Sequence, residues 1–383
     1  MMKRLFIIIF ALSAIAGCDT IKRHILGGSE DWLLFRGDNS LSGYTREALP
    51  DNMKLLWSYK SGVRTVSSPV IMGGTTYWCD VKGKVRGVDS DGNAAFEYDM
   101  QTPVEATPML HDSVLYIGRI DGALAAISLS KRDTLWCYRT EGQISASPNV
   151  VDFGREKALV VGSYDNYMYC IDLHSGALRS KFESGYYING AVATHKSHAI
   201  FGGCDAWLRI VDCQKGEVTD SLQLNGYIPA SPAIAEENIY IGDYSGNIYE
   251  IRTDKGRIYD YRTLLAAEEN SGALVSVPAV TPDVLYITSS DKYLFAIDRT
   301  TGKELWRYLL KGNIGESSPV VADDKVVICS RTGVVSIVDA ASGELRWEHD
   351  AGEQIVASPA VVGGRLYVLT AKGTLLCFGE KED

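Results

Sequence analysis

The chain has 383 residues, 46% of them hydrophobic and 22% charged, and its 38 basic and 48 acidic side chains give a net charge of −10. This length and apolar content are enough for a large packed core. An acidic chain in which no basic patch stands out is not expected to bind a nucleic-acid backbone, so we expect no nucleic-acid partner.

The first residues have the features of an export signal. Lys3 and Arg4 precede a run of mostly apolar residues, 5–16, which is too short to cross a bilayer as a helix. The run ends in the sequence I-A-G-C, which resembles the lipobox of bacterial lipoproteins, with Cys18 at the position that receives the lipid.

Two interpretations of this segment are open. It is either a lipoprotein signal or an ordinary secretory signal that happens to contain a cysteine. Because the charge, the length and the lipobox agree, we predict a lipoprotein signal peptide over residues 1–17 and lipid attachment at Cys18. Residues 18–30 are then a lipidated tether that anchors the protein in a membrane.

Residues 31–383 repeat a pattern of about 40 residues eight times. The proline of a step similar to S-P-V, replaced by Val192 in the fourth repeat, recurs at intervals of 39 to 46 residues. A second marker, an apolar residue followed by Asp in most repeats, recurs in parallel. Eight repeats of this period are typical of a β-propeller. The residues that mark the repeats are Pro69, Pro108, Pro148, Val192, Pro232, Pro278, Pro319 and Pro359.

Each repeat has the pattern of four short strands. The first follows the proline, and the second is a stretch such as Leu115–Gly118. A two-residue turn such as Asp121-Gly122, which suits positive φ, leads to a third strand such as Leu124–Ile127 with strand-like alternation. The fourth strand carries tryptophan in several repeats, as in Leu305–Tyr308.

The two ends of the repeat region complement each other. The last repeat ends at Phe378 after three strands, whereas Leu56–Tyr59 has the pattern of a fourth strand but follows no repeat. Because an unpaired strand would leave an open sheet edge, we expect the N-terminal strand to complete the last blade. The sequence therefore predicts one all-β domain over residues 31–383: an eight-bladed β-propeller of four-stranded antiparallel blades, closed by the N-terminal strand.

The residues before each proline predict what lies near the axis. The residue two positions before the marker is small in all eight repeats, as expected where blades crowd together. One position earlier, Glu105, Asn189 and Glu316 form a candidate axial mouth. They could hold a hard cation or form a solvated rim, and we favour the rim because an oxygen site needs about six ligands or more.

The repeated patterns A-I-D-x-x-T-G-x-x-L-W-x-Y (296–308) and S-S-P-V-V (317–321) resemble the PQQ-like, or quinoprotein-type, propeller family over roughly residues 31–379. The stretch Asp31–Gly37 is similar to the strap that precedes the first blade in many relatives. A lipoprotein of this length without an added domain is similar to the BamB family of the outer-membrane β-barrel assembly machine. The resemblance implies a non-enzymatic scaffold with protein partners in that machinery.

The same resemblance implies a lipoprotein that faces the periplasm, in the outer membrane more than in the inner one. Asp19 resembles the inner-membrane retention signal of enteric bacteria, a rule that does not hold in all phyla.

Quinoprotein dehydrogenases share these repeats and are the first alternative. They resemble this chain in fold but carry a calcium-binding carboxylate and amide, a catalytic Asp and often a vicinal cysteine pair, and this chain has no adjacent cysteines. We therefore predict no enzyme, with no catalytic, cofactor-binding or metal-binding residues and no cofactor. The fourth-strand tryptophans are expected to pack blades together: Trp57, Trp136, Trp306 and Trp347.

Two other ligand sites are possible in principle. His195 and His198 lie in a predicted turn, but zinc needs three or four ligands and no further ligand is evident, so two solvated histidines are the simpler interpretation. In a carbohydrate- or small-ligand-binding propeller, Tyr186, Tyr187 and Tyr227 could stack on sugars, although strand propensity explains the tyrosines equally well.

The longest insertion in the repeats, Arg262–Leu274, is a candidate partner loop. It combines Leu264 and Leu265 with Glu268 and Glu269, the apolar centre and acidic rim that an interface uses. The alternative is a tolerated surface insertion. Loops carry binding in many scaffolds, so this insertion is the predicted docking feature.

Overall fold

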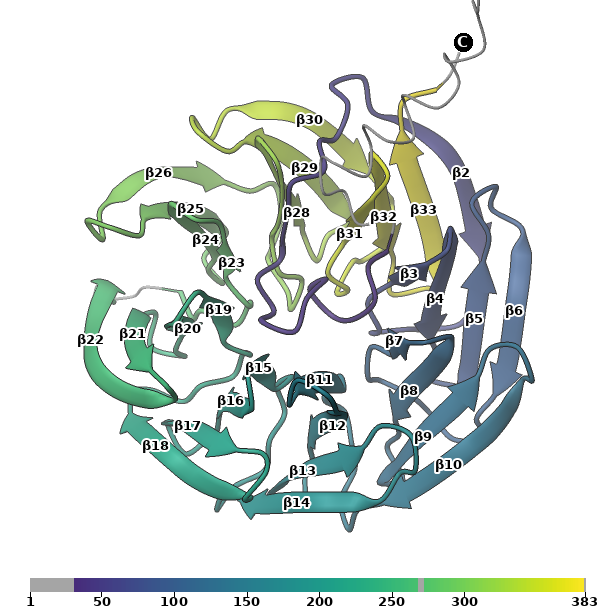
Figure 1. Cartoon of the computed structure of the whole chain (residues 1–383). Coiled ribbons are helices and arrows are strands. Elements are labelled where there is room, and N and C mark those ends of the chain that lie inside the picture. The colour runs from purple at the N-terminus through teal and green to yellow at the C-terminus, as the bar shows by residue number, and fades with distance from the viewer. Residues whose placement is uncertain (1–30, 268–271, 382–383) are drawn as a thin grey trace, which may run out of the picture.

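The computed structural model describes residues 31–267 and 272–381, which form strands and turns. The strands make eight sheets arranged around a central axis, which confirms the predicted eight-bladed propeller (Figure 1). No helix in the described ranges is long and apolar enough to cross a membrane. The predicted signal over 1–17, the tether over 18–30 with Cys18, and Glu268 and Glu269 lie outside the described residues.

Blades 1–4 follow the chain in order, each from the axis outward. Blade 1 contains β3 (Val70–Met72), β4 (Thr75–Cys79), β5 (Lys84–Val88) and β6 (Ala94–Asp99). Blade 2 contains β7 (Met109–His111), β8 (Val114–Gly118), β9 (Ala123–Ser128) and β10 (Asp133–Arg139). Blade 3 contains β11 (Asn149–Asp152), β12 (Lys157–Gly162), β13 (Tyr167–Asp172) and β14 (Leu178–Glu183). Blade 4 contains β15 (Ala193–His195), β16 (His198–Gly202), β17 (Trp207–Asp212) and β18 (Glu217–Gln223).

Blades 5–8 continue in the same way. Blade 5 contains β19 (Ala233–Ala235), β20 (Asn238–Gly242), β21 (Ile248–Asp254) and β22 (Arg257–Leu265). Blade 6 contains β23 (Ala279–Val280), β24 (Val284–Thr288), β25 (Tyr293–Asp298) and β26 (Glu304–Leu309). Blade 7 contains β27 (Val320–Ala322), β28 (Lys325–Cys329), β29 (Val334–Asp339) and β30 (Leu345–Asp350). Blade 8 contains β31 (Ala360–Val362), β32 (Arg365–Leu369), β33 (Thr374–Gly379) and the N-terminal β2 (Lys54–Lys60).

The predicted closure of the ring is present. Strand β2 pairs antiparallel with β33, in a register that sets Trp57 opposite Cys377. The last blade therefore has four strands, and the outer edge of β33 is covered by a segment from the start of the propeller.

Burial within a blade explains the strand patterns. The middle strands pack against neighbouring blades on both faces, and all six residues of β9 are buried. The outer strands have one face in solvent, so β10 alternates between exposed and half-buried residues. This difference makes the second and third strands nearly continuous apolar runs and the fourth strands amphipathic.

The turns between the second and third strands contain four residues, or five in blade 5, rather than two, and only the fourth has positive φ. Glycine occupies that position in most blades, as at Gly122 with φ 81°. Asn166, Ala206 and Lys292 hold it in blades 3, 4 and 6, with φ of 73°, 64° and 77°, a conformation that favours glycine. The prediction that these turn residues have positive φ is therefore confirmed for the second residue of each pair, such as Gly122, and is wrong for the first, such as Asp121.

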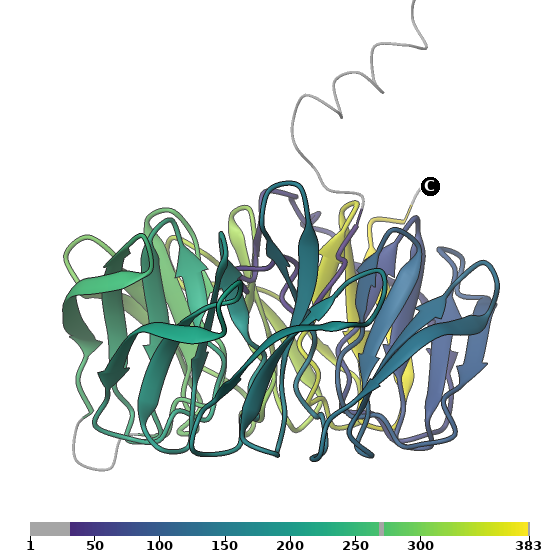
Figure 2. The same cartoon turned by 60° about the horizontal axis from the view of Figure 1, so that its bottom comes forward.

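The two faces of the ring differ. The turns between first and second strands lie on one face, called here the strap face, and the second-to-third turns and the connections between blades lie on the opposite loop face (Figure 2). Residues 31–47, the strap, cross the axis on the strap face and contain β1 (Tyr44–Thr45), which pairs parallel with β27 as a fifth strand of blade 7.

The strap forms hydrogen bonds to every blade. Its backbone or side chains bond, from blade 1 to blade 8, to Ile71, Leu110, Asn149, Thr194, Ile234, Val280, Val321 and Gly363. Leu34 and Leu41 of the strap are buried in the largest hydrophobic cluster. The strap was expected only to precede the first blade, and the structure shows that it covers the axis on this face.

Candidate functional site

The fourth-strand tryptophans connect neighbouring blades. Each half-buried indole donates from Nε1 to a backbone carbonyl oxygen of the next blade. For Trp136 the acceptor is Leu173, at 3.2 Å, and a Cβ at Gly176 would lie 2.5 Å from the indole ring. The corresponding bonds run from Trp57 to Ser90, from Trp306 to Ala340 and from Trp347 to Met53. These contacts are between blades, and the four tryptophans line no part of the axial pocket described below.

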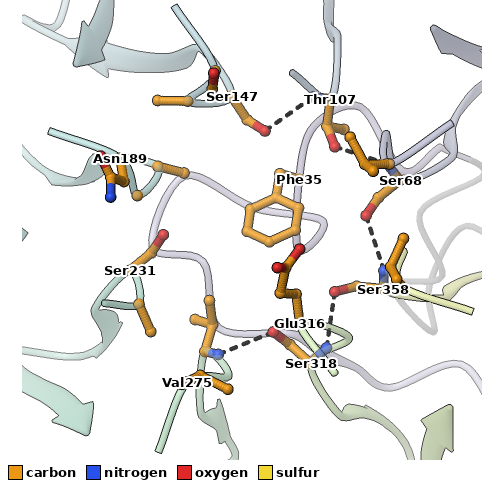
Figure 3. Close-up of a pocket in the computed structure, with 18 of the residues that line it drawn as sticks. Phe35, Ser68, Thr107, Ser147, Asn189, Ser231, Val275, Glu316, Ser318 and Ser358 are labelled. Carbon is orange, nitrogen blue, oxygen red and sulfur yellow. Dashed lines mark hydrogen bonds between the residues drawn. The ribbon is translucent and has the colours of Figure 1, made fainter. Parts of the chain in front are cut away.

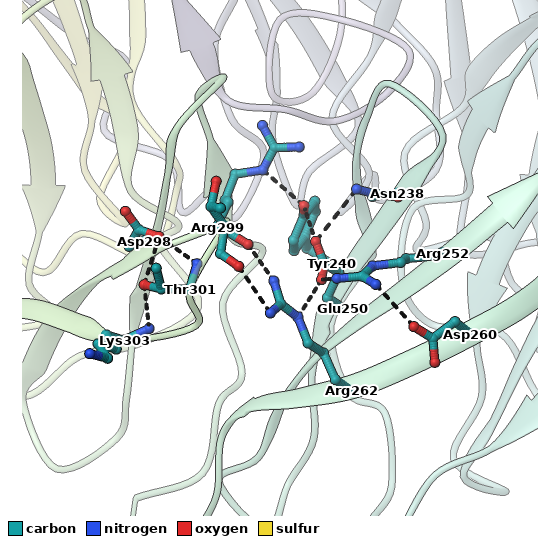
Figure 4. Close-up of polar contacts among 11 residues, drawn as sticks. Asn238, Tyr240, Glu250, Arg252, Asp260, Arg262, Asp298, Arg299, Thr301 and Lys303 are labelled. Atoms are coloured by element: carbon teal, nitrogen blue, oxygen red, sulfur yellow. Dashed lines mark hydrogen bonds and ion pairs between the residues drawn. The ribbon is translucent and has the colours of Figure 1, made fainter.

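In blade 5 an arginine makes the contact that tryptophan makes elsewhere. Arg262 donates to the carbonyl oxygens of Thr300, at 3.1 Å, and Arg299, at 2.5 Å, in blade 6 (Figure 4). Its Nε also lies 2.6 Å from the carboxylate of Glu250, whose side chain is 3% exposed. Tyr240 donates to the same carboxylate at 2.8 Å. This buried polar network was not predicted, because the tryptophan pattern is absent from this repeat.

An axial pocket of about 580 Å³ opens on the loop face. Glu105, Asn189 and Glu316 all line it, so the structure brings the three residues of the candidate axial mouth into one site. Figure 3 shows Asn189 and Glu316 in this lining. Asn189 Oδ1 is buried without a hydrogen-bond partner among the described residues. Arg331 contributes the guanidinium in the lining, which sequence reasoning did not place there.

The pocket wall is built from hydroxyl side chains that directly precede the repeat proline. The backbone N–H of one blade donates to the Oγ of the next at 2.8 to 3.2 Å. The accepting hydroxyls belong to Thr107, Ser147, Ser318, Ser358 and Ser68. The bond from Ser358 to Ser68 joins the last blade to the first. These residues were overlooked, although their fixed place in the repeat was a usable signal.

The strap provides the floor of the pocket. Phe35 lies at the centre of the ring of side chains (Figure 3). The next residue, Arg36, is 1% exposed and donates to the carbonyl oxygens of Pro278, at 3.0 Å, and Pro319. Burial lowers the pKa of Arg36 to about 9, although Asp38 opposes this shift. Arg36 thereby fixes the strap under the axis, and no repeat pattern pointed to either residue because both precede the first repeat.

Five tyrosines lie on the loop face of blades 3 to 5, and all but the half-buried Tyr187 are exposed. Tyr164 lines the pocket and stacks on Tyr187 with ring centroids 5.1 Å apart and planes 4° apart. Tyr187 also contacts Tyr186, at 4.3 Å between centroids. Tyr227 and Tyr244 are 62% and 60% exposed, and the backbone N–H of Tyr244 donates to the carbonyl of Tyr227 at 2.8 Å. These five residues are called the tyrosine rim.

The predicted partner loop is partly taken up by a strand. Strand β22 extends to Leu265, so the insertion lengthens the outer strand of blade 5 before the chain turns. Leu264 is 8% exposed and belongs to the largest hydrophobic cluster, and Leu265 is half-buried against it. The Leu264 side chain is therefore not available as an apolar anchor for a partner. Leu264 is buried because it packs against the edge of blade 6, next to Gly302.

The two histidines pair across a hairpin rather than forming a metal site. His195 and His198 are opposite each other in β15 and β16, and His195 Nε2 lies 3.5 Å from Glu237. Burial lowers the pKa of His198. Among residues 31–267 and 272–381, no group of three or more His, Cys, Asp or Glu side chains is placed to hold a metal ion.

The axial pocket does not fit PQQ with calcium. PQQ is a tricarboxylic acid, so its negative charges would be repelled by the carboxylates of Glu105 and Glu316. The lining offers one guanidinium, that of Arg331, to compensate these charges. Calcium needs at least six oxygen ligands, which the described carboxylates do not assemble. The pocket residues therefore do not support the dehydrogenase alternative.

Comparisons with known proteins agree on the architecture and on one family. The family model described as outer membrane protein assembly factor BamB matches residues 23–218 and 291–382. Outer membrane protein assembly factor BamB of Shewanella oneidensis is 24% identical over 277 residues, which cover 68% of this chain and 67% of that protein. The protein of the same name from Legionella pneumophila is 23% identical over 39% of this chain and 36% of its own length.

Solved structures show the same fold. The crystal structure of BamB from Moraxella catarrhalis aligns with a TM-score of 0.71 at 18% identity and covers 86% of this chain and 98% of its own. Quinohemoprotein alcohol dehydrogenase from Comamonas testosteroni aligns with a TM-score of 0.75 at 14% identity, over 96% of this chain and 83% of its own. At such identities the likeness concerns the fold and does not decide between a scaffold and an enzyme.

Proposed function

The chain belongs to the family of outer membrane protein assembly factor BamB, and we propose that it is a non-enzymatic, lipid-anchored scaffold of outer-membrane protein assembly. In this proposal Cys18 carries the lipid, the propeller faces the periplasm from the outer membrane, and the loop face docks onto the β-barrel assembly machinery. The family match and the relative of the same name from S. oneidensis support this role.

The separation of the two faces carries the proposal. The described chain begins at Asp31 on the strap face, where the Asp31 carboxylate accepts a 2.7 Å hydrogen bond from the Gly73 N–H in a first-to-second turn. The 13 residues from Cys18 to Asp31 reach at most about 45 Å when extended. A lipid at Cys18 would therefore be attached on the strap side and leave the loop face free for a partner.

The loop face has the side chains that a docking surface needs. Tyr186, Tyr227 and Tyr244 are 41%, 62% and 60% exposed. Tyrosine is enriched at interface centres because it buries a large rigid ring and keeps a hydroxyl for hydrogen bonding. We assign the tyrosine rim, rather than the Arg262–Leu274 insertion, as the main contact surface.

Affinity capture from membranes tests the docking role. A C-terminally tagged protein should recover components of the β-barrel assembly machinery, and the triple variant Tyr186→Ala, Tyr227→Ala, Tyr244→Ala should recover at least tenfold less. The matched control is Tyr259→Ala with Tyr261→Ala, two exposed tyrosines on the outer strand β22. Efficient capture that lacks assembly components would contradict the role.

Two further measurements test the anchor and the absence of catalysis. Cys18→Ala should release the protein from the membrane fraction, and retention of this variant in the membrane would contradict lipid anchoring. Incubation of the purified protein with PQQ and calcium should produce no dye-linked alcohol oxidation, whereas measurable turnover would contradict a non-enzymatic role.

A further inference from the structure

The axial pocket presents a set of unused hydrogen-bond donors. The hydroxyls of Ser68, Thr107, Ser147, Ser318 and Ser358 each accept a backbone N–H, which leaves the hydroxyl hydrogen free to donate. No contact in the described part of the chain takes up those hydrogens. All five residues line the pocket, so their donors are available to a bound molecule.

Ser231 is a sixth hydroxyl in this wall, and it differs from the other five. It is 4% exposed, lines the pocket, and forms no hydrogen bond with any residue in the described ranges (Figure 3). Because Ser231 lines the pocket and its hydroxyl is not used in a structural contact, that hydroxyl can both donate to and accept from a molecule in the pocket.

The pocket also presents acceptors. The carboxylates of Glu105 and Glu316 and the unpartnered Oδ1 of Asn189 lie in the same lining. Arg331 offsets one of the two negative charges. A polyanion would face the carboxylates, and a polycation would leave the hydroxyl donors unpaired. A neutral molecule whose groups both donate and accept satisfies both sets.

Aromatic rings supply flat apolar surface in the same place. Phe35 forms the floor, where Arg36 and its bonds to Pro278 and Pro319 hold the strap in place. Tyr164 is a second aromatic group in the wall and is supported by stacking on Tyr187. The negative face of an aromatic ring attracts polarised C–H groups, such as those on one face of a sugar ring.

We propose that the axial pocket binds a neutral saccharide of one or two sugar rings. One ring stacks on Phe35, its hydroxyls donate to Glu105 and Glu316, and its oxygens accept from Ser231 and the other wall hydroxyls. The volume of about 580 Å³ lies within the range of small-molecule sites, roughly 300 to 1,000 Å³. This site goes beyond the docking role and does not rest on it, because Phe35, Ser231 and the other wall hydroxyls lie inside the pocket and do not belong to the tyrosine rim.

Ligand-detected nuclear magnetic resonance on the purified full-length protein tests the site. Glucose, N-acetylglucosamine, maltose, cellobiose and chitobiose serve as probes at tens of millimolar, with spermidine and citrate as charged probes. At least one saccharide should receive saturation from the protein, and neither charged probe should. Binding of a charged probe in place of the sugars, or of no saccharide at all, would overturn the proposal.

Two variants locate the binding. Phe35→Ala should weaken saccharide binding about tenfold, the loss expected for one stacked aromatic surface. Ser231→Ala should weaken it about threefold to tenfold with an unchanged unfolding transition, since the Ser231 hydroxyl bonds to no other residue in the described part of the chain. Ser231→Ala decides the question if Phe35→Ala disturbs folding. Tyr259→Ala on the outer strand is the control, and an equal effect of all three variants would contradict the site.

Discussion

Trp57 and Ser90 join the last blade to the first. The indole Nε1 of Trp57 in β2 donates a 2.8 Å hydrogen bond to the carbonyl oxygen of Ser90 in blade 1. Gly92 lies under the same ring, where a Cβ would be 3.0 Å from the indole. Trp136 makes the corresponding contacts between blades 2 and 3, so the seam of the ring uses the contact that holds ordinary neighbours together.

Removal of this contact should weaken the whole ring. We expect Trp57→Ala to lower the free energy of unfolding by about 2 to 4 kcal/mol, because it loses a half-buried aromatic ring and a hydrogen bond. Urea unfolding followed by circular dichroism measures the change, with Trp136→Ala as the matched variant away from the seam. A large loss in Trp136→Ala with none in Trp57→Ala would show that the seam does not depend on the indole.

The network around Arg262 should behave as a buried ion pair. Arg262→Ala leaves the 3%-exposed carboxylate of Glu250 with fewer partners and should cost about 3 kcal/mol of unfolding free energy. Arg262→Lys should recover only part of this, because lysine lacks the guanidinium fork that also reaches Arg299 and Thr300. The same urea titration measures both variants.

A double variant separates the charge from the packing. Glu250→Gln added to Arg262→Ala should restore part of the lost stability, because the buried carboxylate no longer needs a counter-charge. Strictly additive losses in the double variant would contradict a direct coupling between the two side chains.

Acid should weaken the turn that ends β29. The Asp339 carboxylate accepts from Arg346 and from the backbone N–H of Ser342, each at 2.8 Å, and these bonds lower its pKa to about 2. In the unfolded chain the carboxyl has a pKa near 3.8, so the unfolded state takes up a proton first as the pH falls. This contribution is complete above about pH 5 and should disappear as the pH falls from about 5 through about 2.

The Asp339→Asn variant isolates that contribution. It should lose about 0.5 to 1 kcal/mol at neutral pH, a modest amount because Arg346 is 53% exposed and solvent screens the pair. Between about pH 4 and pH 2 its unfolding free energy should fall less steeply than that of the parent protein. Parallel curves for the two proteins would contradict the role of this carboxylate.

The thiols should react in the order of their exposure. Cys137 is exposed and Cys204 is half-buried, whereas Cys79 and Cys329 are fully buried. Burial raises the pKa of the Cys329 thiol to about 12, which keeps it protonated and unreactive at neutral pH. Alkylation followed by peptide mass spectrometry should label Cys137 first and Cys79 and Cys329 only on unfolding. Equal rates would contradict the assignment of these cysteines to the middle strands.

The fold of the repeated part of the chain could be predicted because every repeat forms the same four-stranded blade, so the same sequence pattern recurs eight times. The proline spacing gave the blade number, and the isolated strand pattern at Leu56–Tyr59 gave the closure that β2 and β33 make. The same register placed Glu105, Asn189 and Glu316 at one pocket. The periodicity of the sequence was therefore enough to predict both the fold and which residues lie near the axis.

Features outside the repeats could not be obtained in this way. The strap bonds to all eight blades, in seven of them through backbone groups of the blade, and a backbone group has no residue signature in the sequence. Phe35 therefore gave no hint that it lies at the axis. Arg262 replaced the expected tryptophan, and Leu264 looked like an exposed anchor because its burial depends on the neighbouring blade.

Deletion of β2, residues Lys54–Lys60, tests the central claim most directly, because the loop face and the axial pocket both require a closed ring. We predict that the shortened protein loses its cooperative urea transition, whereas a deletion of equal length between Cys18 and Asp31 leaves the transition unchanged. A β2-deleted protein that remained monomeric and unfolded at the same urea midpoint as the parent would contradict the closed ring.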